Sequence, residues 1–298
     1  MTTILEKTAG LVAFVRTVDA GSFSAASRAI GSSQSAVSKS VARLEQRLGV
    51  RLIQRSTRTL SLTSEGQAYY ERVAPLLRAI DDAEDVVQVA ATARGRLRVT
   101  APQEFGRVLI AAWADEFLER HPGLKLELGI TDRFVDIISE GFDVAVRMGT
   151  LTDSELVSRK ITELRWSMVA APLYVERHGL PESLDDLHAS HTCLRYVVGG
   201  RAWPIRLADG TPIARDGRFD SDDGGALRQA AVNAAGVAYL LRVTVAEDLA
   251  AGRLVEVLPH IAMSRLPVYA LHAFGRQLPL RARLFIEFLL EKSAGLDF

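Results

Sequence analysis

Side chains suited to contacting a polyanion gather between Ser22 and Thr63 of this 298-residue chain. Amide, hydroxyl and cationic groups recur there at helical spacing, opposite a stripe of aliphatic residues. Such groups hydrogen-bond the base edges and phosphate oxygens of duplex DNA. The predicted DNA-contacting residues are Gln34, Ser35, Ser38, Lys39, Arg43, Arg55 and Arg58.

The charge of this segment differs from that of the whole chain. The chain has 36 basic and 36 acidic residues and a formal net charge of +0. Between Arg28 and Arg58 there are seven basic residues and one acid, Glu45, which gives a local charge of +6. A neutral chain with one basic segment favours a polyanionic partner. For the charge alone, solvated arginines on a surface helix are an equally good explanation.

Three helices and a two-stranded wing are predicted to position these groups. Ser22 is a candidate N-cap of the second helix, and Gly31 with Ser32-Ser33 separates it from the third. The wing consists of the segments 50–55 and 60–63, with Arg58 at its tip, where an arginine reaches a minor groove or the DNA backbone. The predicted core residues are Leu11, Phe14, Val15 and Val18 of the first helix, Phe23, Ala26, Ala29 and Ile30 of the second, and Val37, Val41, Leu44 and Leu48 of the third.

The stretch LEQRLGVRLIQR followed by LTSEG, within the segment from Phe14 onward, resembles the DNA-binding domain of LysR-type transcriptional regulators. The resemblance continues to the C-terminus through LRVTAPQEFG, HPGLKLELGITDR, GFDVAVRMG and VAEDLAAGRLVEVLP. It implies a sequence-specific DNA-binding regulator controlled by a small-molecule effector. Ser56-Thr57-Arg58 and DVAVRMG are similar to a subgroup with members that respond to quinones, aldehydes and other reactive small molecules.

The segment from Ser64 is predicted to be a long helix, with Ser64 and Gln67 as a capping box. Apolar residues follow at alternating gaps of four and three, which is typical of a heptad seam between two helices. Pro75 is expected to kink this helix or to remove one hydrogen bond. Packing on its own domain is the alternative to dimerisation, but LysR-type regulators pair through this linker. The predicted dimerisation residues are Tyr69, Val73, Leu76, Ile80, Ala83 and Val87.

Dimerisation predicts the form of the DNA site. Two recognition helices related by a two-fold axis read an inverted repeat, one half-site in each of two successive major grooves. The family resemblance further implies tetramers that bend DNA between two sites. RNA polymerase is a further candidate partner.

From Arg96 strands and helices alternate, which predicts a mostly parallel sheet covered by helices, one at 105–120 and another that begins at 135–138. The resemblance implies two α/β lobes like those of periplasmic solute-binding proteins, with crossings near residues 162 and 267. The fold class is therefore α/β, with a mostly helical winged helix-turn-helix, a linker helix and a two-lobed effector-binding domain. The predicted boundaries are 1–63, 64–92 and 93–298, with lobe I at 93–162 and 267–298 and lobe II at 163–266.

Ligands of such open sheets bind at the carboxyl ends of strands and at helix N-termini. Polar residues that end or follow predicted strands are candidates, and Arg147 would suit a carboxylate. Asp222 and Asp223 have the alternative role of capping the helix that begins near Gly225. The predicted effector-binding residues are Thr100, Pro102, Gln103, Thr131, Arg147, Tyr196, Ser221, Asp222 and Arg242.

Other classes of protein are disfavoured. The sequence has no P-loop, HExxH, GxSxG or CxxC motif, so no catalytic residue, cofactor or metal is predicted and the chain is not expected to be an enzyme. His188 and His191 lack an obvious third metal ligand. The single cysteine, Cys193, excludes an intramolecular disulfide and is either a packing residue or a redox or electrophile sensor. With no signal peptide and no apolar run near the ~20 residues that span a bilayer, a cytoplasmic location without membrane contact is expected, and a solute-binding protein is disfavoured.

Overall fold

The structure is a computed structural model that describes residues 4–55, 60–87, 93–151, 156–213, 217–275 and 278–294. The chain divides into two compact units. The first contains Met1–Ala91 and Val135–Gly141, and the second contains Thr92–Phe134 and Phe142–Phe298. No helix in the described ranges has the length and apolarity to cross a membrane.

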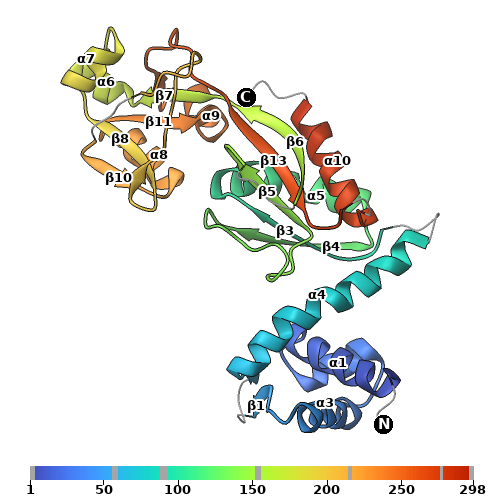
Figure 1. Ribbon diagram of the computed structural model, residues 1–298. Coiled ribbons are helices and arrows are strands. Elements are labelled where there is room, and N and C mark those ends of the chain that lie inside the picture. The colour runs from blue at the N-terminus through green and yellow to red at the C-terminus, as the bar shows by residue number, and fades with distance from the viewer. Residues whose placement is uncertain are drawn as a thin grey trace. The chain divides into compact units, whose positions relative to one another are not determined.

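The first unit is a helical domain with a small wing (Figure 1). Its core joins the first three helices to the start of the fourth, and Phe14 is fully buried at its centre. The elements are α1 (Ile4–Asp19), α2 (Phe23–Ile30), α3 (Gln34–Leu48), β1 (Ile53–Arg55), β2 (Leu60–Leu62) and α4 (Ser64–Val87).

The predicted caps of α2 and α3 are confirmed, whereas Ala29 of α2, expected in the core, is exposed. The Oγ of Ser22 accepts a hydrogen bond from the Ala25 N–H at 3.1 Å, and Ser33 caps α3 in the same way. Gly31 ends α2 in the left-handed region with φ 68°, where a residue without Cβ avoids strain. The predicted stripe of α3 is buried at three of its four positions. Leu48 is the exception, because it lies at the end of the helix and is 37% exposed.

The predicted wing is present, and Glu45 attaches it to α3. β1 and β2 pair antiparallel, with Ile53 opposite Leu62. Oε1 of Glu45 accepts the backbone N–H groups of Leu52 and Ile53 at 2.8 and 3.1 Å. The wing tip with Arg58 lies outside the described residues.

The predicted capping box of α4 is wrong. Thr63 caps the helix instead, since its Oγ1 accepts the N–H of Gly66 at 2.9 Å. A Cβ added to Gly66 would lie 1.9 Å from the carbonyl oxygen of Leu52, so only glycine allows α4 to pack this closely against the residue before the wing. The helix continues through Pro75, whose missing N–H removes one hydrogen bond without ending it.

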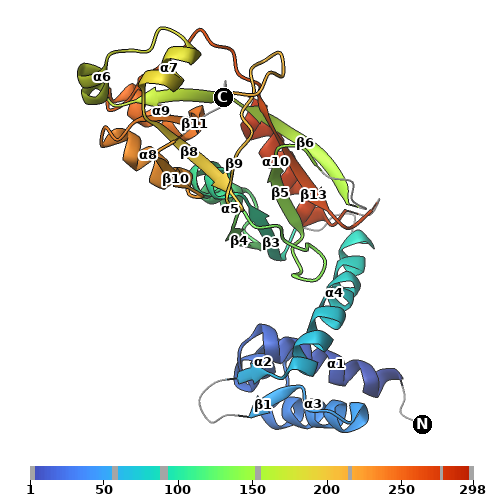
Figure 2. The ribbon, with the colours of Figure 1, turned by 60° about the vertical axis from the view of Figure 1, so that its left-hand side comes forward.

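The second unit consists of two α/β lobes (Figure 2). The first lobe has a five-stranded sheet in the order β4-β3-β5-β13-β6, with η1, α5 and α10 packed against it. Its elements are β3 (Gly95–Ala101), η1 (Phe105–Ile110), α5 (Ala111–Arg120), β4 (Leu124–Ile130), β5 (Val144–Met148), β6 (Val157–Leu164), β13 (Leu266–His272) and α10 (Leu280–Ala294). The predicted helix at 105–120 is present, and its first six residues form a π-helix.

The second lobe has a sheet in the order β10-β8-β11-β7-β12, with β9 paired to β8. Cys193 is buried in its core. Its elements are β7 (Trp166–Ala170), α6 (Pro172–His178), α7 (Leu184–Ser190), β8 (Cys193–Val198), β9 (Arg201–Ala202), β10 (Phe219–Ser221), α8 (Gly224–Val232), β11 (Val237–Leu241), α9 (Arg242–Ala250) and β12 (Val255–Glu256).

Two expectations for this region are wrong. The sheets are mixed rather than mostly parallel, because β6 leaves the first lobe and β13 returns to it, so these neighbours run in opposite directions. The helix predicted to begin at 135–138 is only a short turn. Oδ1 of Asp136 accepts the N–H groups of Ile138 and Ser139, as a helix N-cap does, but the turn ends at Gly141, which has a φ of 69°.

Candidate DNA-binding face and effector cleft

The predicted recognition face is the outer face of α3. Gln34, Ser35, Lys39 and Arg43 are exposed, and Ser38 is half-buried between them. Val37, Val41 and Leu44 anchor the opposite face in the core, which fixes the helix beneath these polar groups. The side chains of Arg55 and Arg58 lie outside the described residues.

The carboxylate of Glu45 binds the wing and leaves the local charge at +6. This group is partly buried and holds the backbone of the wing, as described above. The one acid among seven basic residues therefore has a structural role, and the basic groups of α3 remain available to a polyanion.

The effector cleft lies within the second unit, between its two lobes. It encloses a cavity of about 120 Å³ with mainly apolar and aromatic walls. The cavity is lined by Pro102, Glu104, Thr131, Asp132, Arg147, Met148, Trp166, Tyr196, Val198, Trp203, Gly224, Tyr239, Leu240, Leu241, Thr244 and Leu266. Among them Pro102, Thr131, Asp132 and Met148 end or follow strands of the first lobe, and Val198 and Leu241 end strands of the second, as expected for a ligand site in open sheets.

Four of the predicted effector-binding residues line this cavity: Pro102, Thr131, Arg147 and Tyr196. The other five do not. Thr100 is fully buried in β3, and the guanidinium of Arg242 pairs with Glu256. The backbone N–H of Gln103 donates to Asp132, Ser221 Oγ accepts the N–H of Asp223, and Asp222 is exposed.

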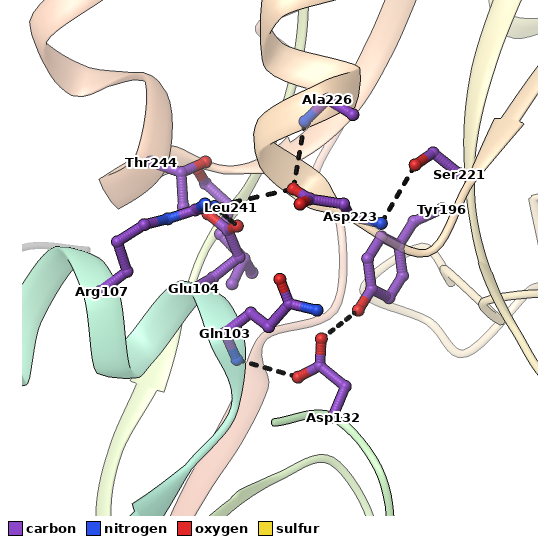
Figure 3. Close-up of polar contacts among 10 residues, drawn as sticks. All are labelled: Gln103, Glu104, Arg107, Asp132, Tyr196, Ser221, Asp223, Ala226, Leu241 and Thr244. Atoms are coloured by element: carbon purple, nitrogen blue, oxygen red, sulfur yellow. Dashed lines mark hydrogen bonds and ion pairs between the residues drawn. The ribbon is translucent and has the colours of Figure 1, made fainter. Parts of the chain in front are cut away.

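One polar contact across the cleft joins Tyr196 to Asp132 (Figure 3). The hydroxyl of Tyr196, on β8, donates to Oδ2 of Asp132 at 2.8 Å. Oδ1 of Asp132 accepts the N–H of Gln103 at 2.9 Å. Burial raises the pKa of the Tyr196 hydroxyl, and the bond to the Asp132 carboxylate raises it further, so Tyr196 stays a hydrogen-bond donor.

A second contact joins Glu104 and Arg107 of the first lobe to the start of α8 (Figure 3). Nη2 of Arg107 lies 2.5 Å from Glu104 and 3.8 Å from Asp223, the N-cap of α8. A Cβ on Gly224 would lie 2.9 Å from Oε1 of Glu104, so glycine permits this close approach of the two lobes. Burial raises the pKa of Glu104, with smaller contributions from Asp223 and Asp132, while Arg107 lowers it.

The sequence interpretation missed Glu104, Asp132 and the two tryptophans, Trp166 and Trp203. Asp132 follows Thr131 at the end of β4, so the same rule that selected Thr131 applies to it. Trp166 and Trp203 carry no such signal, because an aromatic residue in a strand or loop is usually a core residue.

Comparison with known proteins identifies the family. The "LysR substrate binding domain" matches residues 90–294, and the "Bacterial regulatory helix-turn-helix protein, lysR family" matches residues 9–67. The HTH-type transcriptional regulator CrgA of Neisseria meningitidis serogroup C is 35% identical over 286 residues, which is 95% of each chain. The chain belongs to the LysR family of bacterial transcriptional regulators.

Two solved structures of this family have the same two-part architecture. CrgA of Neisseria meningitidis, described as a LysR-type transcriptional regulator, matches with a TM-score of 0.64 and 32% identity over 99% of this chain and 100% of its own. AphB, described as a virulence activator of Vibrio cholerae, matches with a TM-score of 0.61 and 28% identity over 95% and 98% of the two chains.

The family assignment confirms the main functional prediction. This LysR-family chain is a transcriptional regulator and not an enzyme, with a helix-turn-helix domain that binds DNA and a two-lobed α/β domain that binds an effector. The described residues contain no group of three or more His, Cys, Asp or Glu side chains placed to hold a metal ion.

The raised pKa of Glu104 predicts how stability depends on pH. A carboxyl whose pKa is higher in the folded state stabilises the fold at low pH, and this stabilisation is lost as the pH rises through the folded-state pKa. Glu104→Gln cannot ionise, so the variant should gain in free energy of unfolding relative to the wild type as the pH rises from 4 to 8. Urea unfolding at each pH measures this difference.

Glu163→Gln is the matched control, because Glu163 pairs with Lys160 on the surface of the first lobe. If the free energy of unfolding of Glu104→Gln relative to the wild type fell as the pH rises, Glu104 would not be a carboxylate destabilised by burial at the cleft.

Proposed function

We propose that this regulator reads an inverted-repeat operator as a dimer or tetramer, with α3 in the major groove. The main support is the exposed polar and basic face of α3, whose opposite face is buried in the core. The one acid of this helix, Glu45, hydrogen-bonds the wing. Gln34, Ser35, Ser38 and Lys39 meet base edges and nearby phosphates. Arg43, Arg55 and Arg58 meet mainly phosphates or a minor groove.

We propose that α4 provides the dimer contact through the part of its seam that its own domain leaves uncovered. Tyr69 and Val73 pack against the core of the first unit, with the Tyr69 ring 5.8 Å from that of Phe14. Leu76 and Ile80 are 64% and 58% exposed. The seam continues to Ala83 and Val87, whose side chains lie outside the described residues.

We propose that the effector is a small uncharged molecule built on a single ring. The cavity of about 120 Å³ is close in size to the apolar cavity of about 150 Å³ that binds benzene. Trp166, Trp203 and Tyr196 supply aromatic walls. The acidic groups already have partners, since Glu104 pairs with Arg107 and Asp132 accepts from Tyr196. Nη1 of Arg147 donates to the Val146 carbonyl at 3.0 Å. A charged ligand would have to break one of these contacts.

We propose that the chain has three functional parts. They are a DNA-binding domain at 1–63, a linker and dimerisation helix at 64–92 and an effector-binding domain at 93–298, with the two lobes as predicted. Because a bacterial regulator must reach the DNA that it binds, we propose that the protein is cytoplasmic. Contact with RNA polymerase and membership of the subgroup that responds to quinones and aldehydes remain predictions.

The DNA contacts predict distinct effects for phosphate and base contacts. Arg43→Gln should weaken binding to any duplex and reduce the slope of log K against log salt by about 0.9, because one phosphate loses its counter-charge. Gln34→Ala should instead reduce the preference for the operator over scrambled DNA. Fluorescence anisotropy on the two duplexes across a salt series measures both effects. Arg177→Gln, an exposed change on α6, should alter neither the salt slope nor the operator preference. An unchanged salt slope for Arg43→Gln would show that Arg43 contacts no phosphate.

The dimer contact predicts that Leu76→Asp and Ile80→Asp shift the protein toward monomer, because a carboxylate in an apolar helix pair loses hydration without gaining a partner. Sedimentation velocity over a concentration series measures this shift. Leu180→Asp is the control, since Leu180 is 56% exposed but lies outside α4. A sedimentation coefficient that stays at the wild-type value in both α4 variants would show that the chains pair elsewhere.

The cleft proposal predicts a preference among ligands of equal size. Benzyl alcohol should bind at least about tenfold more tightly than benzoate or benzylammonium, measured by calorimetry, because a charged group loses more hydration than a hydroxyl on entering a mainly apolar cavity. Trp203→Leu should remove most of this binding, whereas Trp113→Leu, a change away from the cavity, should not. Tighter binding of either charged compound would contradict an uncharged effector.

A further inference from the structure

Helix α4 has two parts with different surroundings. Ala74 is fully buried in the core of the first unit. Beyond it the helix extends past α1, α2 and α3, and Leu76 and Ile80 are exposed (Figure 1). One helix therefore carries the attachment to the DNA-binding domain in its first part and, in its second part, the apolar side chains proposed to pair with a second copy.

The start of α4 is held against the residues that precede the wing strand β1. The N–H of Thr63 donates to the carbonyl oxygen of Leu52 at 3.0 Å, and its Oγ1 donates to that of Arg51 at 2.6 Å. The same Oγ1 accepts the N–H of Gly66. Since Gly66 has no room for a Cβ beside the Leu52 carbonyl, these contacts leave the first turn of α4 only one position.

Two neighbouring tyrosines hold the next turn of α4 to α1 and α3. The hydroxyl of Tyr70 donates to Oδ1 of Asp19, the last residue of α1. The side chain of Arg47, in the last turn of α3, is hydrogen-bonded to the hydroxyl of Tyr69. The centres of the two tyrosine rings lie 5.8 and 6.4 Å from that of the buried Phe14.

The two hydroxyl contacts fix the direction of α4 in a way that apolar packing does not. A hydrogen bond weakens steeply when its angle changes, whereas burial of apolar surface is non-directional. Packing of Tyr69 and Tyr70 on Phe14 alone would allow α4 to turn or tilt. With their hydroxyls bound to α3 and α1, the angle between α4 and the recognition helix is set within the first unit.

We propose that Gly66, Tyr69 and Tyr70 determine the spacing between the two half-sites of the operator, because they set the angle between α3 and α4. The inference rests on the proposed function, in which two copies pair through α4 and each places one α3 in a half-site. The half-sites of a symmetric dimer must match the distance between its recognition helices. That distance depends on the α4 contact and on the angle between α4 and α3.

Specificity then has two separate determinants in this domain. The outer face of α3 recognises the sequence of each half-site, and the attachment of α4 determines how far apart the half-sites lie. A duplex with a single half-site tests only the first determinant, whereas an inverted repeat tests both. The two can therefore be changed independently.

Selection of sites from a pool of random-sequence duplexes by the full chain, followed by fluorescence anisotropy on the selected sites, tests the proposal. The wild type should select an inverted repeat of one spacing, and insertion of a base pair between the half-sites should weaken binding by about tenfold or more. Tyr269→Phe, which removes a hydroxyl from β13 in the second unit, is the matched control and should behave as the wild type.

The double variant Tyr69→Phe with Tyr70→Phe keeps both rings and loses both hydroxyl contacts. It should bind a single half-site as tightly as the wild type does, because α3 is unchanged. Insertion of the base pair should now weaken its binding by only about threefold or less, because α4 can adjust its angle.

Gly66→Ala should change the angle rather than loosen it. The added Cβ, 1.9 Å from the Leu52 carbonyl oxygen, must displace the start of α4. The variant should select the same half-site sequence at a different spacing, and its binding to a single half-site shows that the domain is folded. Retention of the wild-type spacing by this folded variant would exclude Gly66 as a determinant of spacing.

Two results with the double variant would overturn the proposal. One is normal binding to the half-site together with the full wild-type preference for spacing. The other is loss of binding to the half-site, since the hydroxyls would then stabilise the domain instead of setting an angle. A wild type that selects no inverted repeat would contradict the proposed function itself, and this inference with it.

Discussion

The antiparallel pairing of β6 with β13 is the constraint on which the second unit depends. These two strands carry the chain out of the first lobe and back into it, and Leu164 and Leu266 at their ends are buried in that lobe's core. The residues next to this pair line two cavities. Trp166 and Leu266 line the effector cleft, while Arg165 and Arg265 line a second cavity of about 260 Å³. Both cavities therefore lie next to the point where the chain passes between the lobes.

The effector cleft is held by polar contacts between the lobes as well as by its apolar walls. Tyr196 reaches Asp132, and Glu104 with Arg107 reaches the start of α8. In each contact, burial of the polar groups would cost free energy if their hydrogen bonds or ion pairs were absent. An effector that strengthens or breaks them shifts the balance between lobe arrangements by its differential affinity for the two. We propose that this balance links occupation of the cleft to DNA binding.

The sequence was informative where structure is local. Ser22, Ser33 and Gly31 mark the ends of α2 and α3, and the buried stripe of α3 follows from its periodicity alone. The errors arise from tertiary contacts. Thr63 rather than Ser64 caps α4, and only the proximity of Gly66 to the Leu52 carbonyl explains the tight packing there. The rule that ligands bind at strand ends located Thr131, Arg147 and Tyr196, but Trp166 and Trp203 become cleft residues only when the two lobes meet.

Recognition of a specific operator by α3 and the wing is the basis of the proposed function. Fluorescence anisotropy of the full chain on the DNA upstream of its own gene, compared with scrambled DNA across a salt series, tests it most directly. We expect tighter binding to the upstream fragment, with a preference that persists as rising salt weakens both complexes. The absence of binding to either duplex at low salt would contradict operator recognition by α3 and the wing.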